Sequence, residues 1–349
     1  MAGQAVAAAA LPSEVSLRPI GPRAESLFSA DLAGVPGRTD GLVASRDGRV
    51  IGAVLATSRQ LLADDESHSV LQILEVRTDV TSLGPPLLEA TCRRCAPADA
   101  LAALDETGTA TTWRPLAPPA TVVRIHRPGR TFDLPGGRVL DRCVHRGVRA
   151  ADRVRALTSD LRRSIDVAPV DVVASNDVPA DLLAELHADV GEAGVRFERN
   201  RETLADLKEH RRFRTYVGYR HGTPAGAALV ERGHGVTVAD VAPPGLPRTD
   251  PTVMDAILRA VVEEHRDVPV IRSTDSVLGR TLCQRWGFAD VDRIPLRWWW
   301  PRRHRAVRSL DPSRPPRIGS YALDEPDGWH VTPLDGVYLG RPGPPSRPR

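Results

Sequence analysis

Lysine is almost missing from this sequence of 349 residues: Lys208 is the only one, although Lys and Arg together number 47. Chemistry that depends on a lysine amine, such as Schiff-base formation or the lysine of a phosphate-binding P-loop, therefore has a single candidate. We exclude a P-loop nucleotidase. The formal net charge of +3 is small for this length, and it gives no electrostatic reason to expect a nucleic acid or an acidic membrane surface as partner.

Cysteine is scarce as well. Cys92, Cys95, Cys143 and Cys283 are too few and too scattered for a disulfide framework, so we expect free thiols and a cytoplasmic location. Cys92 and Cys95 have the spacing of a metal or redox pair, but no second Cys or His pair stands at zinc-finger spacing. We therefore expect two half-buried helix cysteines and no metal.

Long apolar runs are absent too. Residues 1–10 contain only a short apolar run and no basic region before it, so they predict neither a secretion signal nor a membrane span. We expect residues 1–14 to be disordered. With 41% hydrophobic and 26% charged residues, the rest of the chain is typical of a soluble globular protein of about two domains.

One pair of segments indicates an internal repeat. Residues 42–55 and 216–229 both contain an Arg two residues before a turn glycine, and a second glycine four residues after it. Asp47-Gly48 and His221-Gly222 favour a hairpin turn, because both positions of such a turn take positive φ. The second glycines, Gly52 and Gly226, indicate a bulge or a close backbone approach in the second strand of each hairpin. Two unrelated hairpins that share turn chemistry are the alternative.

The second hairpin is followed by a regular series of elements. A strand is predicted over residues 235–242, then a Pro/Gly-rich loop over 243–247 and a helix with its apolar face at Val253, Ile257, Ala260 and Val261. A strand over 268–271 and a helix from Asp275 come next.

The first hairpin is followed by a similar but less regular series. Residues 69–76 predict a strand, and Pro85 opens a helix after the loop at 79–84. No clear fifth strand appears between helices near 87–94 and 98–104. Residues 109–116 and 120–125 are expected to be the closing strands of this copy.

The segment Leu282-Cys-Gln-Arg-Trp-Gly-Phe288 resembles the end of the fourth helix in the GNAT superfamily of N-acyltransferases, where a Leu-Tyr-x-x-x-Gly-Phe pattern precedes a strand. Two copies in one chain resemble the tandem GNAT architecture of mycothiol synthases and actinobacterial biosynthetic enzymes. The resemblance implies an α+β fold of two domains, each a central mixed, mostly antiparallel sheet flanked by helices. We expect domains at residues 15–130 and 168–305, joined by a linker over 131–167.

The family binds coenzyme A at a loop whose backbone N–H groups face the pyrophosphate at a helix N-terminus. The corresponding loops here, 79–84 and 243–247, depart from the family pattern: the first begins with Asp79 and the second contains three prolines, which lack N–H groups. The resemblance still implies an acetyl-CoA or other acyl-CoA co-substrate. Its expected binding residues are Val76, Ser82 and Gly84 in the first copy and Val241, Ala242, Gly245 and Leu246 in the second.

Acyl transfer to an amine needs a base for the ammonium proton and an acid for the leaving thiolate. The family base is often a carboxylate on the fourth strand, a place that Asp240 and Glu75 take here; an outward-facing or loop-capping carboxylate is the alternative for each. The family acid is commonly the helix tyrosine. Cys283 stands at that position, either as a substitute acid or as a packing residue.

Four further residues are candidates for substrate binding. Arg196 and Arg199 precede the second hairpin, where the family builds its acceptor site, and they would grip a carboxylate; a solvated charged face is the alternative. Tyr216 and Tyr219 offer hydroxyl groups, although aromatic strand residues usually pack.

The linker predicts an amphipathic helix with an arginine-rich face, which we expect to brace the two domains, with RNA contact as the alternative. Its two faces are Val144, Val148, Ala151, Val154, Leu157, Leu161 and Ile165, and Arg146, Arg149, Arg153, Arg155, Arg162 and Arg163. A Pro/Arg/Gly-rich tail, mostly without compact structure, is expected over 306–349, with residues 329–330 and 337–339 docking on another part of the protein. The run Trp298 to Trp300 is expected to end the last strand of the second copy.

The leading hypothesis is a cytoplasmic N-acyltransferase of specialised metabolism, monomeric or homodimeric, with a small amine as acceptor and one copy catalytic. One alternative is an aminoacyl-tRNA-dependent amide-forming transferase, because the Fem-type enzymes also resemble paired GNAT folds. The other is a GNAT-like protein that has lost acyl transfer.

Overall fold

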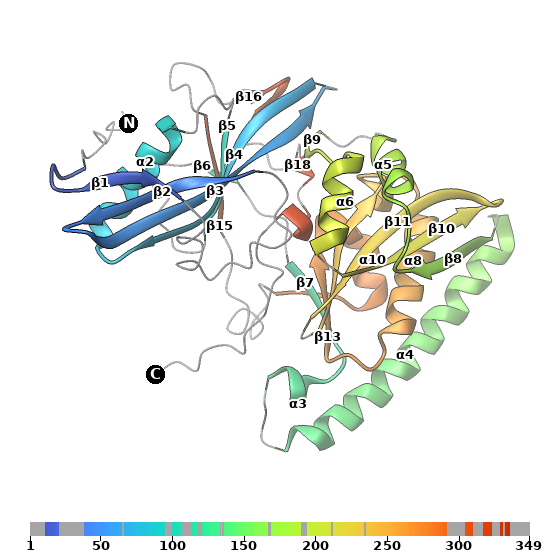
Figure 1. The fold of residues 1–349 in the computed structure, drawn as a ribbon. Coiled ribbons are helices and arrows are strands. Elements are labelled where there is room, and N and C mark those ends of the chain that lie inside the picture. The colour runs from blue at the N-terminus through green and yellow to red at the C-terminus, as the bar shows by residue number, and fades with distance from the viewer. Residues whose placement is uncertain are drawn as a thin grey trace, which may run out of the picture. The chain divides into compact units, whose positions relative to one another are not determined.

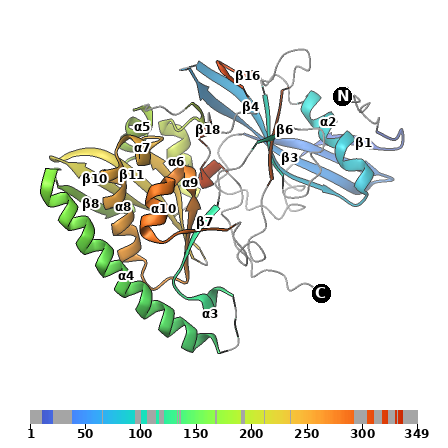
Figure 2. The same cartoon turned by 180° about the vertical axis from the view of Figure 1, so that it is seen from behind.

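The structure is a computed structural model. It describes residues 11–20, 38–64, 66–94, 100–105, 114–116, 121–132, 134, 136–166, 169–189, 194–210, 212–233, 235–291, 304–309, 317–322, 329–330 and 332–335. The chain divides into two compact units (Figures 1 and 2). Unit 1 comprises residues 1–118, 194–198 and 303–329, and unit 2 comprises residues 119–193, 199–302 and 330–349.

Unit 1 is built on a mixed sheet in which only β4 and β5 pair in parallel among the described strands. The main path runs β1-β2-β3-β4-β5-β15-β6, and β9 pairs with the far end of β3. The bounds are β1 Ser16–Pro19, β2 Arg38–Arg46, β3 Arg49–Ala63, β4 Glu66–Thr78, β5 Ala100–Asp105, β6 Arg114–Leu116, β9 Val195–Phe197 and β15 His304–Ser309. Helix α2 (Gly84–Arg94) covers the sheet, and its Leu87 and Leu88 pack with Leu42, Val54 and Leu71.

Unit 2 contains a second sheet with an equivalent strand order, β14-β7-β13-β12-β11-β10-β8. Here too one described pair, β12 with β13, is parallel and the others are antiparallel. The bounds are β7 Thr121–Ile125, β8 Val170–Ser175, β10 Phe213–Arg220, β11 Thr223–Arg232, β12 Val236–Ala242, β13 Val270–Thr274 and β14 Ala289–Asp290.

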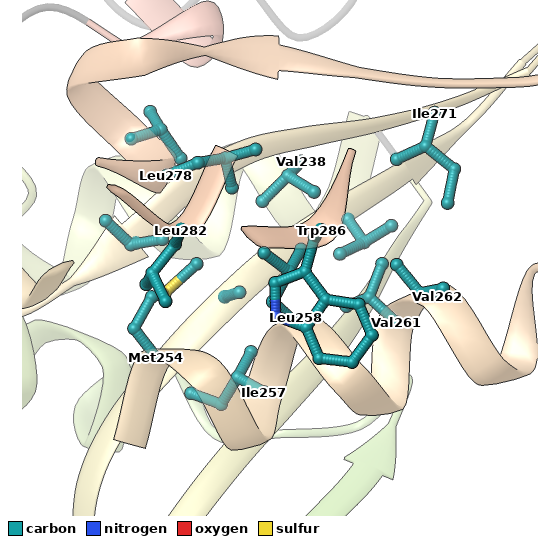
Figure 3. Packing of buried hydrophobic residues seen from close by; sticks show 14 of the residues in the cluster. Val238, Met254, Ile257, Leu258, Val261, Val262, Ile271, Leu278, Leu282 and Trp286 are labelled. Carbon is teal, nitrogen blue, oxygen red and sulfur yellow. The ribbon is translucent and has the colours of Figure 1, made fainter. Parts of the chain in front are cut away.

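Helices cover both faces of the unit 2 sheet. On one face, α5 (Ala180–Ala188) and α6 (Arg201–His210) bury Leu183, Leu186, Leu204 and Leu207. On the other face lie α8 (Pro251–Glu264), α9 (Asp275–Leu278) and α10 (Arg280–Trp286). Figure 3 shows the indole of Trp286 among Leu258 and Val261 of α8, and its Nε1 donates to Asp255 Oδ1 at 2.9 Å.

The internal repeat is confirmed at the level of strand register. Asp47 and Gly48 have φ of 51° and 75°, and His221 and Gly222 have φ of 52° and 77°, so the two hairpin turns are alike. A register shift then follows in each hairpin, just before Gly52 and Gly226. A Cβ on Gly52 would lie 3.1 Å from Leu83 Cδ2, and one on Gly226 would lie 2.7 Å from Leu246 Cδ2. Both glycines therefore permit the close approach that the sequence predicted.

The two halves of the chain exchange a strand. Thr121–Ile125, expected to close the first copy, is β7 of unit 2, where it lies between β13 and β14. Conversely β15, which falls at the end of the predicted second domain and in the predicted tail, lies between β5 and β6 of unit 1. The observed units thus differ from the expected ranges 15–130 and 168–305. A strand's alternation shows that it has a buried face, but it does not show which sheet buries that face.

Two further expectations need correction. Residues 98–104 were expected to be a helix, but 100–105 form strand β5, which is the fifth strand that the sequence pattern did not reveal. The tail was expected to lack compact structure, yet β15 to β17 and the 3₁₀ helix η4 (Pro333–Asp335) lie within it, with β16 at Arg317–Ile318 and β17 at Tyr321–Ala322. Trp298 to Trp300 lie outside the described residues.

The linker helix is α4 (Gly137–Asp166), which follows the short α3 (Pro128–Thr131) and runs along one side of unit 2 (Figure 1). Asp152 on α4 forms ion pairs with Arg124 of β7 and, at 3.3 Å, with Arg155. The predicted faces hold at Val144, Val148, Arg146, Arg149 and Arg153, but two residues depart from them: Val154 is 60% exposed, and Arg155 turns toward the unit.

Arg155 meets the Gly287–Phe288 end of α10. Gly287 has φ of 71°, and Phe288 N donates to Cys283 O at 2.8 Å, which is the pattern of a left-handed helix cap. A Cβ on Gly287 would lie 3.1 Å from Arg155 Nη2. Glycine is therefore needed here both for the backbone turn and for the approach of α4.

Candidate functional site

Glu75 and Asp240 occupy equivalent positions in the two sheets. On β4, Glu75 pairs with Leu55, and the next pair in the ladder is Ile73 with Ala56, so Leu74 is an extra, bulged residue. On β12, Asp240 pairs with Leu229 and Ala239 is the extra residue in the same way. Each carboxylate therefore follows a bulge at the same place in its sheet, which is a device that re-aims side chains at functional sites.

The parallel ladder ends just before each bulge. The β4–β5 pairing stops at Ile73, and the β12–β13 pairing stops at Thr237. Beyond these points the described residues of β4 and β12 pair on one side only. Each sheet thus has a strand edge without a described partner at this point, beside Glu75 in unit 1 and beside Asp240 in unit 2.

Asp240 is enclosed within unit 2 by charged and polar groups. Its carboxylate is 2% exposed, and Arg199 Nε donates to Oδ2 at 2.8 Å. His187 Nε2 lies 4.0 Å from the same oxygen, and Val241 N donates to Oδ1 at 2.9 Å. The structure thus brings together two of the predicted residues, but as a buried ion pair: Arg199 is 7% exposed and holds Asp240 instead of an acceptor molecule.

The chain's C-terminal segment covers this ion pair. Arg199 Nη2 donates to Thr332 Oγ1 at 3.4 Å, and both Thr332 and Leu334 are buried. Leu334, on η4, belongs to the same apolar cluster as Leu183 and Ala242. Residues 332–335 therefore seal the face of β12 on which Asp240 lies.

The loop after β12 already carries its own anion. Asp250 caps α8 by accepting from Val253 N at 3.1 Å, and Arg220 makes two contacts of 2.8 and 3.0 Å with its carboxylate. An N-terminal carboxylate of this kind satisfies the groups that a pyrophosphate would otherwise bind. Asp250, paired with Arg220, therefore occupies the position at the start of α8 where a pyrophosphate would otherwise bind.

The predicted coenzyme A residues of unit 2 are largely engaged as well. Leu246 is fully buried, and its N–H donates to Pro243 O at 3.0 Å, while Val241 N–H donates to Asp240. Ala242 is buried. Gly245, with φ of 82°, caps the four-residue helix α7 (Leu246–Thr249). The donors named for this loop therefore bind the protein itself.

Glu75 has more open surroundings in unit 1. Its side chain is 16% exposed, and Arg77 Nε lies 2.5 Å from Oε1; the Arg77 side chain is 47% exposed. Val76, the next predicted residue, is half-buried. The Glu75 carboxylate is therefore more exposed than that of Asp240, and its cationic partner is also the more exposed of the two.

The loop of unit 1 leads into α2 through the 3₁₀ helix η1 (Thr81–Leu83). Neither η1 nor the first turn of α2 contains an acidic residue, and Ser82 is exposed while Gly84 is buried. Asp79, which would repel a phosphate, lies 3.9 Å from Arg49 Nη2. Pro85 and Pro86 have no N–H group and Leu83 N–H donates to Val80 O, which leaves the N–H groups of Thr81, Ser82 and Gly84 as candidate donors for a pyrophosphate.

Cys283 is not brought to Asp240 within unit 2. It is 4% exposed within the core on the α8 side of the sheet, whereas Asp240 faces α5 and η4. Burial, and next the charge of Asp275, raise the pKa of the Cys283 thiol to about 12. This geometry fits packing, which was the alternative stated for the residue.

The two tyrosines lie on opposite sides of β10. Tyr216 is fully buried, and its hydroxyl lies 3.0 Å from His265 Nε2 on the α8 side. Burial, followed by a hydrogen bond with Glu264, raises its pKa. Tyr219 follows the bulge and packs on the α5 side. Tyr216 therefore lies on the face of the sheet opposite to that of Asp240.

Arg196 belongs to unit 1, where it pairs with Leu62 near the far end of β3. Leu62 is seven residues beyond Leu55, the partner of Glu75, which corresponds to about 23 Å along a strand. Arg196 is 8% exposed. It therefore cannot share a small substrate with Glu75.

Two other kinds of site, a metal site and a membrane-spanning helix, have no counterpart in the described ranges. No group of three His, Cys, Asp or Glu side chains there could hold a metal ion, and Cys92 is buried in α2 while Cys95 lies outside those ranges. Nor does any helix in the described part of the chain have the length and apolar content that crossing a membrane takes.

Two features of the site were missed from the sequence for different reasons. The Asp250-Pro251 pair has the residue types of an N-cap and a first helical position, so the capped start of α8 was readable. The Arg199–Asp240 pair joins residues 41 positions apart, and no local pattern marks such a pairing.

Comparisons with known proteins support the fold. No protein-family model and no curated protein matches the sequence. A tandem GNAT protein from the clavulanic acid biosynthesis pathway is 12% identical, with a TM-score of 0.48, over 86% of this chain and 100% of that one. A probable N-acyltransferase from Enterococcus faecalis is 9% identical, with a TM-score of 0.47, over 74% of this chain and 64% of that one.

The N-myristoyltransferase of Saccharomyces cerevisiae with bound myristoyl-CoA is 10% identical, with a TM-score of 0.51, over 86% of this chain and 80% of that one. Similarities at these identities concern the fold alone. Together with the repeated strand order and bulges, the similarity to the N-myristoyltransferase, with its TM-score of 0.51, shows a tandem GNAT-type fold of the α+β class.

Proposed function

We propose that this protein is an N-acyltransferase that moves an acyl group from an acyl-CoA to a small amine, and that unit 1 carries the reaction. The observation that carries the proposal is the position of Glu75, which stands after the bulge on β4 beside the end of the parallel ladder and remains accessible. The equivalent position in unit 2 is sealed by the Arg199–Asp240 pair and by η4.

The resemblance to the GNAT family supplies the chemistry. The neutral amine would attack the thioester carbonyl carbon, so that a C–N bond forms, the C–S bond breaks and coenzyme A leaves as a thiolate that takes up a proton. Glu75 would accept the ammonium proton as general base, with Arg77 moving aside. Unit 2 would serve as a structural partner.

The pyrophosphate of the co-substrate would lie at η1 and the start of α2, beside Ser82 and Gly84. The absence of acidic residues from the described first turns, and the pairing of Asp79 with Arg49, support this placement. At the start of α8 the Asp250 carboxylate would repel a phosphate.

Calorimetric titration with acetyl-CoA and with desulfo-CoA tests the proposal. Both should bind the wild type. Ser82→Asp places a carboxylate at the expected pyrophosphate position and should weaken binding about 10-fold or more, as expected for one misplaced charge. Ser82→Asn is the neutral control of matched shape and should bind almost as the wild type does.

Arg248→Asp is the control for unit 2, because Arg248 is exposed on α7 beside the corresponding loop. It should leave affinity nearly unchanged. If neither ligand binds the wild type, the acyl-CoA function is wrong and the chain belongs with GNAT-like proteins that have lost acyl transfer. If Arg248→Asp abolishes binding and Ser82→Asp does not, the function stands but unit 2 carries it.

A further inference from the structure

Helix α4 presents a stripe of arginines on the side that faces away from unit 2. Successive members of the stripe are three or four residues apart, so on a helix of 3.6 residues per turn they fall within an arc of about 80°. All are exposed. We call this set the arginine stripe; it consists of Arg138, Arg142, Arg146, Arg149 and Arg153.

The stretch of α4 that carries the stripe supplies no free counter-charge. Between Gly137 and Arg155 the only acidic residues are Asp141, which is buried and accepts from Gly129 N at 2.6 Å, and Asp152, which binds Arg124 and Arg155. Within the described part of the chain no ion pair involves a member of the stripe. Both carboxylates are thus used to fix α4 on unit 2, and the arginines are left to solvent.

This arrangement works against the stability of the helix. Like charges three and four residues apart repel, and Arg138 stands in the first turn, where the helix dipole favours acidic residues. The five positive charges of the stripe also exceed the net charge of +3 of the whole chain. Positive charge is therefore concentrated on this face of α4 and is not a property of the whole protein surface. When charged residues destabilise a helix and form no stabilising contact in return, their presence indicates a binding function.

We propose that the arginine stripe binds the phosphate backbone of a nucleic acid strand. Fifteen residues of helix separate Arg138 from Arg153, which is about 22 Å. Along the axis of a duplex, one strand carries a phosphate about every 3.4 Å, so about six phosphates fall within the axial length that the five guanidinium groups span. Arginine binds phosphate oxygens in a bidentate manner, and such contacts need no particular base sequence.

Two other occupants fit the surface less well. The apolar side chains exposed next to the stripe include Val139, Leu140 and Val154, without an aromatic residue among them, whereas helices that lie in a membrane surface insert Trp, Phe and Leu. A second copy that packed antiparallel along this strip would bring two arginine stripes together, which costs several kcal/mol. A phosphate backbone is the occupant that complements the charge.

Fluorescence anisotropy of a labelled single-stranded RNA, titrated with the full chain at 50 and 200 mM salt, tests the proposal. Release of counterions from about five phosphates predicts that affinity falls roughly 100-fold between these salt concentrations. The variant Arg142→Gln/Arg146→Gln/Arg149→Gln should bind more weakly and lose only roughly 7-fold, because about two contacts remain. Single-stranded and duplex DNA arms show which nucleic acid is preferred.

The control variant is Arg94→Gln/Arg212→Gln/Arg248→Gln, which removes the same charge from exposed arginines outside α4. It should keep the affinity and the salt dependence of the wild type. Absence of binding to RNA and DNA at 50 mM salt would overturn the proposal, and so would an equal loss in both triple variants. Binding to phosphatidylserine vesicles but to neither nucleic acid would also overturn it.

Discussion

Glu75 and Asp240 stand at the same place in two related sheets, each after a bulge and each opposite a leucine, yet their surroundings differ. Asp240 is 2% exposed and holds Arg199 at 2.8 Å, whereas the Glu75 side chain is 16% exposed and its partner Arg77 reaches solvent. The equivalent position thus forms a buried ion pair in unit 2 and lies at a more exposed sheet edge in unit 1. This contrast is the basis for assigning catalysis to unit 1.

Glu75→Gln is expected to lower acyl transfer about 10²- to 10⁴-fold once an acceptor amine is found, because loss of a general base has effects of that size. Its acetyl-CoA affinity and melting temperature should stay close to those of the wild type. Steady-state kinetics with calorimetry check both. Turnover by Glu75→Gln equal to that of the wild type would show that Glu75 is not the base.

Arg199→Ala is expected to destabilise the protein by about 3–5 kcal/mol, because it leaves the Asp240 carboxylate buried without its partner. The double variant Arg199→Met/Asp240→Leu should recover most of that loss, since apolar residues of similar size can replace a buried pair. Denaturant unfolding measures both. A single variant as stable as the wild type would mean that Asp240 is not enclosed as described.

Acid should weaken the protein through His126. This side chain is 2% exposed, and burial, followed by the charge of Arg124, lowers its pKa to about 4 from 6.5. The unfolded chain binds a proton below pH 6.5 and the folded chain does not, so stability is present above pH 6.5 and is lost as the pH falls toward 4. The loss should reach about 3 kcal/mol.

Denaturant unfolding of the wild type and of His126→Gln from pH 7 to pH 4 measures this contribution. The variant carries no titrating group at this position, so its stability should fall less over the same range. The same decline in both proteins would assign the acid sensitivity to other groups.

The strand exchange predicts that residues 1–118 cannot complete the unit 1 sheet on their own. A fragment of residues 1–118 lacks β15, which pairs with both β5 and β6. It should show no cooperative thermal transition alone and should gain one when co-expressed with residues 119–349. Circular dichroism and co-purification check this. A cooperative transition in the isolated fragment would contradict the exchange.

The parts of the fold that depend on local patterns were predicted from the sequence. The turns at Asp47-Gly48 and His221-Gly222, the apolar face of α8 and the Gly287-Phe288 cap each involve neighbours within a few residues. The exchange of β7 and β15 was missed because the alternation of a strand is the same in either sheet. The strand β5 was missed because Ala100–Asp105, rich in Ala and Leu, has the composition of a helix.

The sequence predicted which positions form the candidate site, but it did not predict which of these residues pair with one another. The sequence identified Glu75, Asp240 and Arg199, but it did not show which of the two carboxylates is enclosed. Burial by Arg199 and Thr332 depends on contacts between distant segments. A regular copy indicates a well-formed fold, and the less regular copy is the one whose carboxylate remains open.

The most direct test of the account is hydrogen exchange with and without acetyl-CoA, because it locates the ligand without a known acceptor. The account predicts added protection in residues 75–88, which comprise the end of β4, η1 and the start of α2, and no change in residues 240–254. Protection confined to residues 240–254 would contradict it, since the acyl-CoA would then lie in unit 2.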